Sequence, residues 1–410
     1  MRLMQKIIKR IFFLRTGLWN KKEPRVINKA DAKESELHLI HILREQNANR
    51  ILVICAEDFK SHIYFTKLKE RMNGAGLKLT LYAAQVENPS ITLVEQCVHL
   101  FFSNNCQAIL AIGGGSIIDL AKATKARIIR SEKSLHKLRG LGKIRSSNKS
   151  APVLIAGPTT ITAAESSKAA WIVDHTNQIK YILNDRALQP NYVMHCAEYL
   201  TTLSNQLLVE TSLGTLAQAF ESLLSKNNSD YINKNALEAI SEILNCLENM
   251  ANNPASFIDN NQTIAGKNQM IETLLNSAFK TGNASGRSGA GYITAIANAL
   301  TVFCNLPYSI VAGLTLPLIL EVYLNKKPSL FARFGNDFNV EKTITQINGL
   351  SKTRSTVTAH QPAKQTKFLP IREISEYVKK DIDSIHSPPL KLSDEKLNEI
   401  LQKISQRIFD

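Results

Sequence analysis

Histidine is missing from a large part of this chain. The 410 residues include nine histidines, and none of them lies between His195 and His360. Iron(II) and zinc sites in proteins are built mainly from imidazole, thiolate and carboxylate donors. A metal site that uses histidine is therefore excluded from residues 196–359.

The sequence also lacks a cysteine motif and a long apolar run. None of the six cysteines has C-x-x-C spacing, and several lie within apolar segments, which predicts buried thiols in a reducing compartment. They are Cys55, Cys97, Cys106, Cys196, Cys246 and Cys304. We find no apolar stretch approaching the ~18 residues that span a bilayer. These features predict a cytoplasmic protein.

Charge is unevenly distributed, with a formal net charge of +15. Residues 1–25 hold eight Lys and Arg residues against one Glu, with apolar residues at helical spacing. Such a segment can lie on an anionic membrane surface, act as a targeting leader, or pack on the body of the protein. We expect no nucleic-acid partner. The rest of the chain has no known nucleic-acid-binding motif and no run of basic residues interspersed with aromatic ones.

The strongest local motif is a strand, a glycine turn and a helix. Ala108–Ile112 is an apolar run, Gly113-Gly114-Gly115-Ser116 follows, and a helical pattern begins at Ile117. Glycines let a large anion approach the backbone, and the N–H groups at a helix start attract phosphate. Ser116 is expected to cap the helix. A glycine loop without a ligand is the alternative.

The order of elements predicts the fold class. Apolar strands alternate with helical patterns up to about residue 200, and long helical patterns follow. This predicts an α/β N-terminal domain, with a Rossmann-like parallel sheet and helices, followed by an all-α C-terminal domain. We expect a basic amphipathic segment over 1–30, the α/β dinucleotide-binding domain over 31–190, a helical domain over 191–350, a flexible linker over 351–370 and C-terminal helices over 371–410. A basic loop over 130–149 and a helical stripe from Leu397 to Ile408 are also predicted.

Several motifs in a fixed order resemble those of one family. They are Asn88-Pro89-Ser90, the glycine turn with Asp119 and Lys122, Pro158-Thr159-Thr160 with Glu165, and later Phe303-Cys304-Asn305-Leu306-Pro307 and Leu316-Pro317. Together they resemble the iron-dependent (group III) alcohol dehydrogenases, part of the dehydroquinate synthase-like superfamily, over roughly residues 48–335.

The resemblance implies NAD or NADP as cofactor. By motif position, the cofactor-binding residues would be Gly113, Gly114, Gly115, Ser116, Asp119, Asn88, Thr159, Thr160, Thr162 and Lys180. Many relatives hold the adenosine ribose with an acidic residue after the first strand. Here that place is Ala56, with Glu57 and Asp58 next, so the choice between NAD and NADP stays open.

The chain departs from the resemblance at the metal site. The family's D-A-L-x-H-A-x-E motif corresponds to a segment with Gly214 and Gln218, and its later histidine positions hold Thr294, Asn298 and Tyr308. Gly, Gln, Thr and Tyr offer neither charge near neutral pH nor a strong nitrogen donor. We therefore expect no metal in this divergent member.

Two functions remain open. The first is a metal-independent oxidoreductase that moves hydride between a nicotinamide cofactor and an alcohol, aldehyde or related carbonyl. Its catalytic residues would be Tyr308, as proton donor, and Asn298, with Thr294 and Gln218 as further hydrogen-bond donors. The alternative is a catalytically inactive dinucleotide-binding sensor or scaffold. We expect a small-molecule substrate, a homodimer and possible peripheral membrane contact through residues 1–25.

Overall fold

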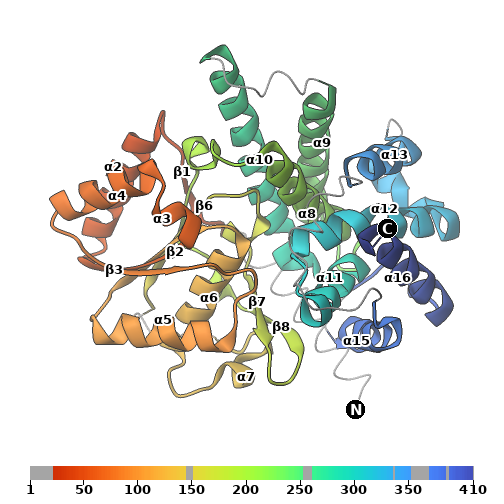
Figure 1. The fold of residues 1–410 in the computed structure, drawn as a ribbon, viewed down its shortest axis with the longest axis horizontal. Helices are drawn as coiled ribbons and strands as arrows, with labels where there is room; N and C mark the ends of the chain where they lie inside the picture. The colour runs from red at the N-terminus through yellow and green to blue at the C-terminus, as the bar shows by residue number, and fades with distance from the viewer. Residues whose placement is uncertain are drawn as a thin grey trace. The chain divides into compact units, whose positions relative to one another are not determined.

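The chain forms two compact units in the computed structural model (Figure 1). The structure describes residues 22–144, 151–252, 261–335, 338–351, 369–384 and 387–409. The α/β unit comprises the described residues of 23–205 together with 261–282, and the helical unit comprises those of 206–252 and 283–409. Most of the basic segment and of the expected linker therefore lies outside the described residues.

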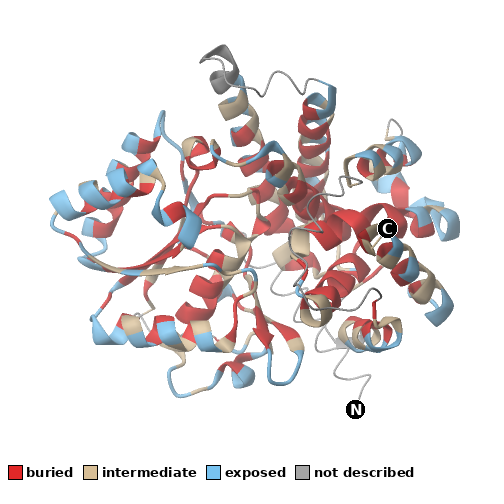
Figure 2. Cartoon of the chain, viewed as in Figure 1, coloured by how far each residue is buried: buried red, intermediate tan, exposed pale blue. Residues whose placement is uncertain are grey.

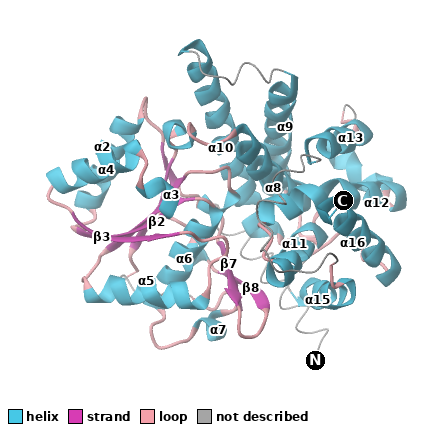
Figure 3. Ribbon diagram, in the orientation of Figure 1, coloured by secondary structure: helices cyan, strands magenta, loops and turns pink. Residues whose placement is uncertain are grey.

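A parallel sheet of six strands forms the centre of the α/β unit, in the order β1-β9-β6-β4-β2-β3. Figure 3 shows the strands in magenta, with β2 and β3 labelled. The strands are β1 (Arg25–Ile27), β2 (Arg50–Ala56), β3 (Lys78–Ala84), β4 (Ala108–Gly113), β6 (Val153–Pro158) and β9 (Tyr192–Met194). Every residue of β4 is buried, as expected for a strand that is covered on both faces. The predicted α/β class is confirmed.

Helices follow the strands in the order expected for parallel crossovers. They are α2 (Ala32–Glu45), α3 (Glu57–Lys60), α4 (Ile63–Gly74), α5 (Ile91–Ser103), α6 (Gly115–Ile129) and α7 (Leu135–Leu138), with short 3-10 turns η1 (Ala163–Glu165), η2 (Arg186–Leu188) and η3 (Ala197–Leu200). Within this unit, burial concentrates on the central strands and on α6 (Figure 2). The unit's core therefore lies around β4 and the helix that follows it.

A second, three-stranded sheet was not predicted from the sequence. Its order is β5-β8-β7, with β5 (Gly140–Leu141), β7 (Ala169–Asp174) and β8 (Ile179–Asn184). The segment over 130–149 was predicted as a solvated loop, and this was wrong for its described part. Leu135 and Leu138 of α7 are buried and β5 pairs with β8, because the two leucines give the basic segment an apolar face.

The helical unit is built from long helices. They are α8 (Asn205–Leu224), α9 (Asp230–Asn252), α11 (Tyr292–Cys304), α12 (Tyr308–Lys326), α13 (Val340–Ser351), α15 (Ile371–Ser384) and α16 (Asp394–Phe409), with the 3-10 segment η5 (Pro328–Phe334) between α12 and α13. The predicted apolar stripe of α16 is buried from Leu397 to Ile408. The predicted all-helical second part is confirmed.

Helix α12 corrects the expectation that no segment is long enough to span a bilayer. Among the described residues it is a helix of 19 residues, apolar enough by length and composition to cross a membrane. However, 72% of its apolar window is buried within the protein. The apolar composition is therefore explained by packing, since a buried helix in a large core is apolar all round.

Neither compact unit is formed by a single contiguous stretch of the chain. Helix α10 (Asn261–Ser288) places its residues up to Gly282 in the α/β unit, although residues 191–350 were expected to form one helical domain. Ser166 Oγ donates to the Phe279 carbonyl at 2.7 Å, which fastens α10 to η1. β1 lies in the sheet beside β9, although residues 1–30 were expected to form a separate segment. Long-range contacts of this kind leave no local pattern in the sequence.

Candidate functional site

The glycine turn joins β4 to α6 and leaves the start of the helix open. Gly114 is the N-cap residue, and no side chain in the described part of the protein caps the first turn of α6. The N–H groups of a first helical turn have no partner within the helix, so they are available to an anion. The prediction that Ser116 caps the helix was wrong: it lies inside α6, and its Oγ donates to the Glu87 carbonyl at 2.6 Å.

The threonine segment after β6 lies against the glycine turn. The Thr159 N–H donates to the Gly113 carbonyl at 3.1 Å. A Cβ on Gly114 would lie 3.0 Å from Thr160 Oγ1, and one on Gly115 would lie 2.7 Å from Thr162 Oγ1. Glycine is therefore required where these segments approach each other. The structure brings together these predicted cofactor residues.

Asn88 and Lys180 meet beside the same turn. Lys180, buried on β8, donates from Nζ to Asn88 Oδ1 at 3.1 Å. The Asn88 Nδ2 atom is buried and has no hydrogen-bond partner among the described residues. An unpaired buried donor costs free energy unless a ligand or water accepts from it. This amide is therefore a candidate ligand contact.

Asp119 and Lys122 bind protein groups. One Asp119 oxygen accepts the Trp171 N–H at 3.0 Å, and the other lies 3.9 Å from Lys122 Nζ. Lys122 is fully buried and donates to the Ala164 and Ala169 carbonyls and to Ser167 Oγ. Burial raises the pKa of Asp119 to about 6, against the opposing charge of Lys122, and burial lowers the pKa of Lys122 to about 8. In this structure Asp119 fastens α6 to β7.

Glu165 and His195 form a buried pair that sequence reasoning did not identify. His195 Nε2 lies 3.2 Å from Glu165 Oε1, and both side chains are almost fully buried. Burial raises the pKa of Glu165, against the opposing effects of His195 and Lys122. The His195 ring also packs edge-on to Phe279 of α10. The pair joins β9, η1 and α10.

A second polar group lies in the helical unit, on α8, α11 and α12. Thr294 Oγ1 donates to Glu221 Oε2 at 2.5 Å, and Thr294 Oγ1 lies 3.1 Å from the Tyr308 hydroxyl. We call Tyr308, Thr294 and Glu221 the hydroxyl chain. Glu221 and Thr294 are buried, whereas Tyr308 is partly exposed. The chain therefore runs from a partly exposed tyrosine residue to a buried carboxylate.

Gln218 and Asn298 flank the hydroxyl chain. Burial and then the Glu221 charge raise the pKa of Tyr308, and Thr294 and then Gln218 partly offset this rise. Asn298 lies one helical turn after Thr294 and is 1% exposed. Both of its amide atoms are buried without a hydrogen-bond partner among the described residues. The predicted pair Tyr308 and Asn298 thus comes from one polar region of the helical unit.

Comparison with known proteins relates the α/β part of the chain to one family. The model for iron-containing alcohol dehydrogenases matches residues 32–195, which include the glycine turn and the threonine segment. Residues 32–195 of the chain are therefore similar to the iron-containing alcohol dehydrogenases. Lactaldehyde reductase of Escherichia coli is 25% identical over 277 residues, 67% of this chain and 65% of that protein. The chain thus spans slightly less than two thirds of that relative's length.

Solved structures share the fold of this chain. An alcohol dehydrogenase from Oenococcus oeni matches with a TM-score of 0.78 and 18% identity, covering 94% of this chain and 99% of that one. Sulfoacetaldehyde reductase from Bifidobacterium kashiwanohense, solved in complex with NAD+, matches with a TM-score of 0.72 and 17% identity, covering 95% and 99%.

The residues that the motif resemblance places at the metal positions do not fit a divalent cation. They are Gly214, Gln218, Thr294 and Tyr308, and among the described residues no three His, Cys, Asp or Glu side chains cluster as metal ligands would. A Cβ on Gly214 would lie 2.9 Å from the Ser309 Cα atom. Since backbone fills the space of the first ligand, even an aspartate there would require α12 to move.

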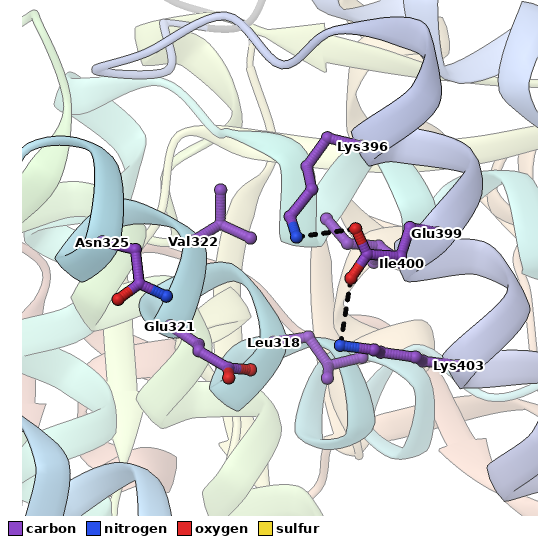
Figure 4. A pocket seen from close by; sticks show the side chains of 8 residues that line it. All are labelled: Leu318, Glu321, Val322, Asn325, Lys396, Glu399, Ile400 and Lys403. Atoms are coloured by element: carbon purple, nitrogen blue, oxygen red, sulfur yellow. Dashed lines mark hydrogen bonds and ion pairs between the residues drawn. The ribbon is translucent and has the colours of Figure 1, made fainter.

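A small groove between α12 and α16 is distinct from both polar regions (Figure 4). It is about 40 Å³ in volume, and Glu399 bridges Lys396 at 2.7 Å and Lys403 at 3.1 Å along its edge. These are i,i+3 and i,i+4 ion pairs along the surface of α16. The groove is too small for a dinucleotide, and we assign it no role.

Proposed function

We propose that this protein is an NAD(P)-dependent oxidoreductase that interconverts alcohols and aldehydes without a metal. The observation that carries the proposal is the uncapped glycine turn, whose first-turn N–H groups suit a pyrophosphate. The buried, unpartnered Asn88 amide gives a ligand a further donor. The NAD+ complex of sulfoacetaldehyde reductase and the aldehyde substrate in the name of lactaldehyde reductase support the same reaction class.

The cofactor, when bound, supplies the hydride chemistry, so the protein must bind, orient and exchange a proton. Tyr308 is proposed to hydrogen bond to the substrate oxygen and to exchange the proton with it. Asn298, whose amide has no partner among the described residues, is proposed to orient that oxygen. Glu57 and Asp58 after β2 oppose the 2′-phosphate of NADP, while Ala56 leaves room for it. The homodimer and the cytoplasmic location remain predictions.

Calorimetric titration with NADH and NADPH, followed by turnover of lactaldehyde and sulfoacetaldehyde with and without chelator, tests the proposal. We expect coenzyme binding, turnover that survives the chelator, and a kcat about 100-fold lower in Tyr308→Phe, because a positioned acid–base group contributes at least that much. Failure to bind either coenzyme contradicts the cofactor assignment. Turnover restored only by iron(II) contradicts metal independence, and binding without turnover favours the sensor alternative.

Gly115→Ala is expected to weaken NADH binding by about 10-fold, because the added methyl occupies the turn that the pyrophosphate approaches. It would also lie 2.7 Å from Thr162 Oγ1, which accepts the Ala164 N–H. Gly74→Ala is the control, since no heavy atom lies within 4 Å of its Cβ position. The Kd of each variant is measured by calorimetry. Unchanged affinity in folded Gly115→Ala protein would show that the turn does not hold the coenzyme.

A further inference from the structure

The direction of the hydroxyl chain follows from the number of protons available. A carboxylate accepts and cannot donate, so the single hydroxyl proton of Thr294 goes to Glu221. The contact between Thr294 Oγ1 and the Tyr308 hydroxyl must then use the Tyr308 proton. With Glu221 ionised, Tyr308 therefore donates toward Thr294. Its oxygen lone pairs are left to accept a proton from elsewhere.

Glu221 occupies the place of a helix cap. The N-cap residue of α11 is Gly291, which has no side chain, and Glu221 Oε1 accepts the Thr294 N–H at 3.1 Å in its stead. A Cβ on Gly291 would lie 2.9 Å from that same oxygen. The start of a helix favours a negative charge, so the anionic form of this buried carboxylate is stabilised there. Glycine at 291 makes room for it.

We propose that Glu221 is a positioning residue that stores the proton which Tyr308 exchanges with the substrate. The proposal rests on the proposed function and extends it to a residue that does not touch the substrate. In reduction, the carbonyl carbon takes the hydride of the reduced nicotinamide and the carbonyl oxygen takes the Tyr308 proton. Tyr308 is reprotonated by Thr294, and Thr294 by Glu221, which enters reduction as a carboxylic acid, leaves it as a carboxylate and regains a proton from solvent before the next turnover. Alcohol oxidation runs the same transfers in reverse.

The geometry distinguishes this role from capping alone. Capping needs only one Glu221 oxygen, which accepts the Thr294 N–H. The proton relay from Glu221 through Thr294 to Tyr308 also needs the second Glu221 oxygen, which binds the Thr294 hydroxyl, and a group that can gain and lose a proton. Glutamine supplies one acceptor oxygen and cannot take part in proton storage near neutral pH. Aspartate keeps a carboxylate that can gain and lose a proton, on a side chain one methylene shorter. The two substitutions therefore separate the roles.

The experiment compares kcat and KM for NADH-driven lactaldehyde reduction in Glu221→Gln, Glu221→Asp, Tyr308→Phe and the double variant E221Q/Y308F. We expect Glu221→Gln to lower kcat about 100-fold with KM nearly unchanged, and Glu221→Asp to recover most of the loss. Because the two residues act in one chain, the double variant should be no more than about threefold slower than Tyr308→Phe alone. Glu210→Gln, which removes an equally buried carboxylate from the same helix, is the control. A kcat within twofold of wild type in Glu221→Gln, or losses that multiply in the double variant, would overturn the relay.

A second measurement separates failure of the relay from failure of the proposed function. If the wild type turns over no aldehyde, the proposed reaction fails, but the coupling between the residues is still measurable. Fluorotyrosine is placed at position 308, and its ionisation is followed by absorbance with and without Glu221→Gln. Removing the negative charge should lower the pKa of this phenol by about one unit. An unchanged pKa would show that Glu221 does not act on Tyr308.

Discussion

Replacing Gly282 by alanine is expected to lower the free energy of unfolding by about 3 kcal/mol, the upper range for overpacking a core. A Cβ at this position would lie 2.2 Å from the Ala163 carbonyl oxygen and 2.2 Å from Ser166 Oγ. The carbonyl belongs to backbone and cannot rotate away. Ser166 is itself held by its bond to the Phe279 carbonyl. The methyl must therefore separate α10 from η1.

Gly266→Ala on the same helix is the matched control. No heavy atom lies within 4 Å of its Cβ position, and alanine is favoured over glycine inside a helix by roughly 0.5–1 kcal/mol. Urea unfolding of both variants measures the difference in midpoint at constant m-value. The contact between α10 and η1 is disproved if Gly282→Ala unfolds within about 0.5 kcal/mol of the control.

The strands and the glycine turn were predictable because their signals are local. The apolar run at 108–112 matches β4 to within one residue, since a strand buried on both faces is apolar throughout. β1 was missed because it is three residues long and Val26 is 44% exposed. A strand that short carries too little pattern to be recognised.

The contacts of the candidate site were harder to predict because they join distant segments. Glu221 meets Thr294 across 73 positions and His195 meets Glu165 across 30, so neither pair leaves a spacing pattern. The sequence identifies Gly214 as an unusual residue at a ligand position. Only the structure explains it, because the Ser309 backbone fills the space of its side chain.

The buried Lys122 is expected to be a major contributor to the stability of the α/β unit. Its ammonium binds two carbonyls and the Ser167 hydroxyl and lies 3.9 Å from Asp119 Oδ1. Lys122→Met keeps the side-chain volume but leaves these acceptors and the carboxylate without their cation. Removing one partner of a buried charged group costs about 3–5 kcal/mol. We expect a loss in that range in urea unfolding.

Lys125→Met is the control for Lys122→Met, because Lys125 lies on the same buried helix and makes, within the described segments, one hydrogen bond, to Asn191 Oδ1 at 3.1 Å. Its loss should be about 1 kcal/mol. Equal losses in the two variants would show that the acceptors around Lys122 contribute little.

The pH dependence of the free energy of unfolding provides a second test of Lys122. Its pKa is lowered to about 8 in the folded protein from 10.5, chiefly by burial. Between these values the unfolded chain binds more protons than the folded one, so stability rises with pH across that window. Lys122→Met lacks this contribution. The stability advantage of the wild type over the variant should therefore grow as the pH is raised from 8 to 10, and a difference that stays constant would mean that Lys122 ionises normally in the fold.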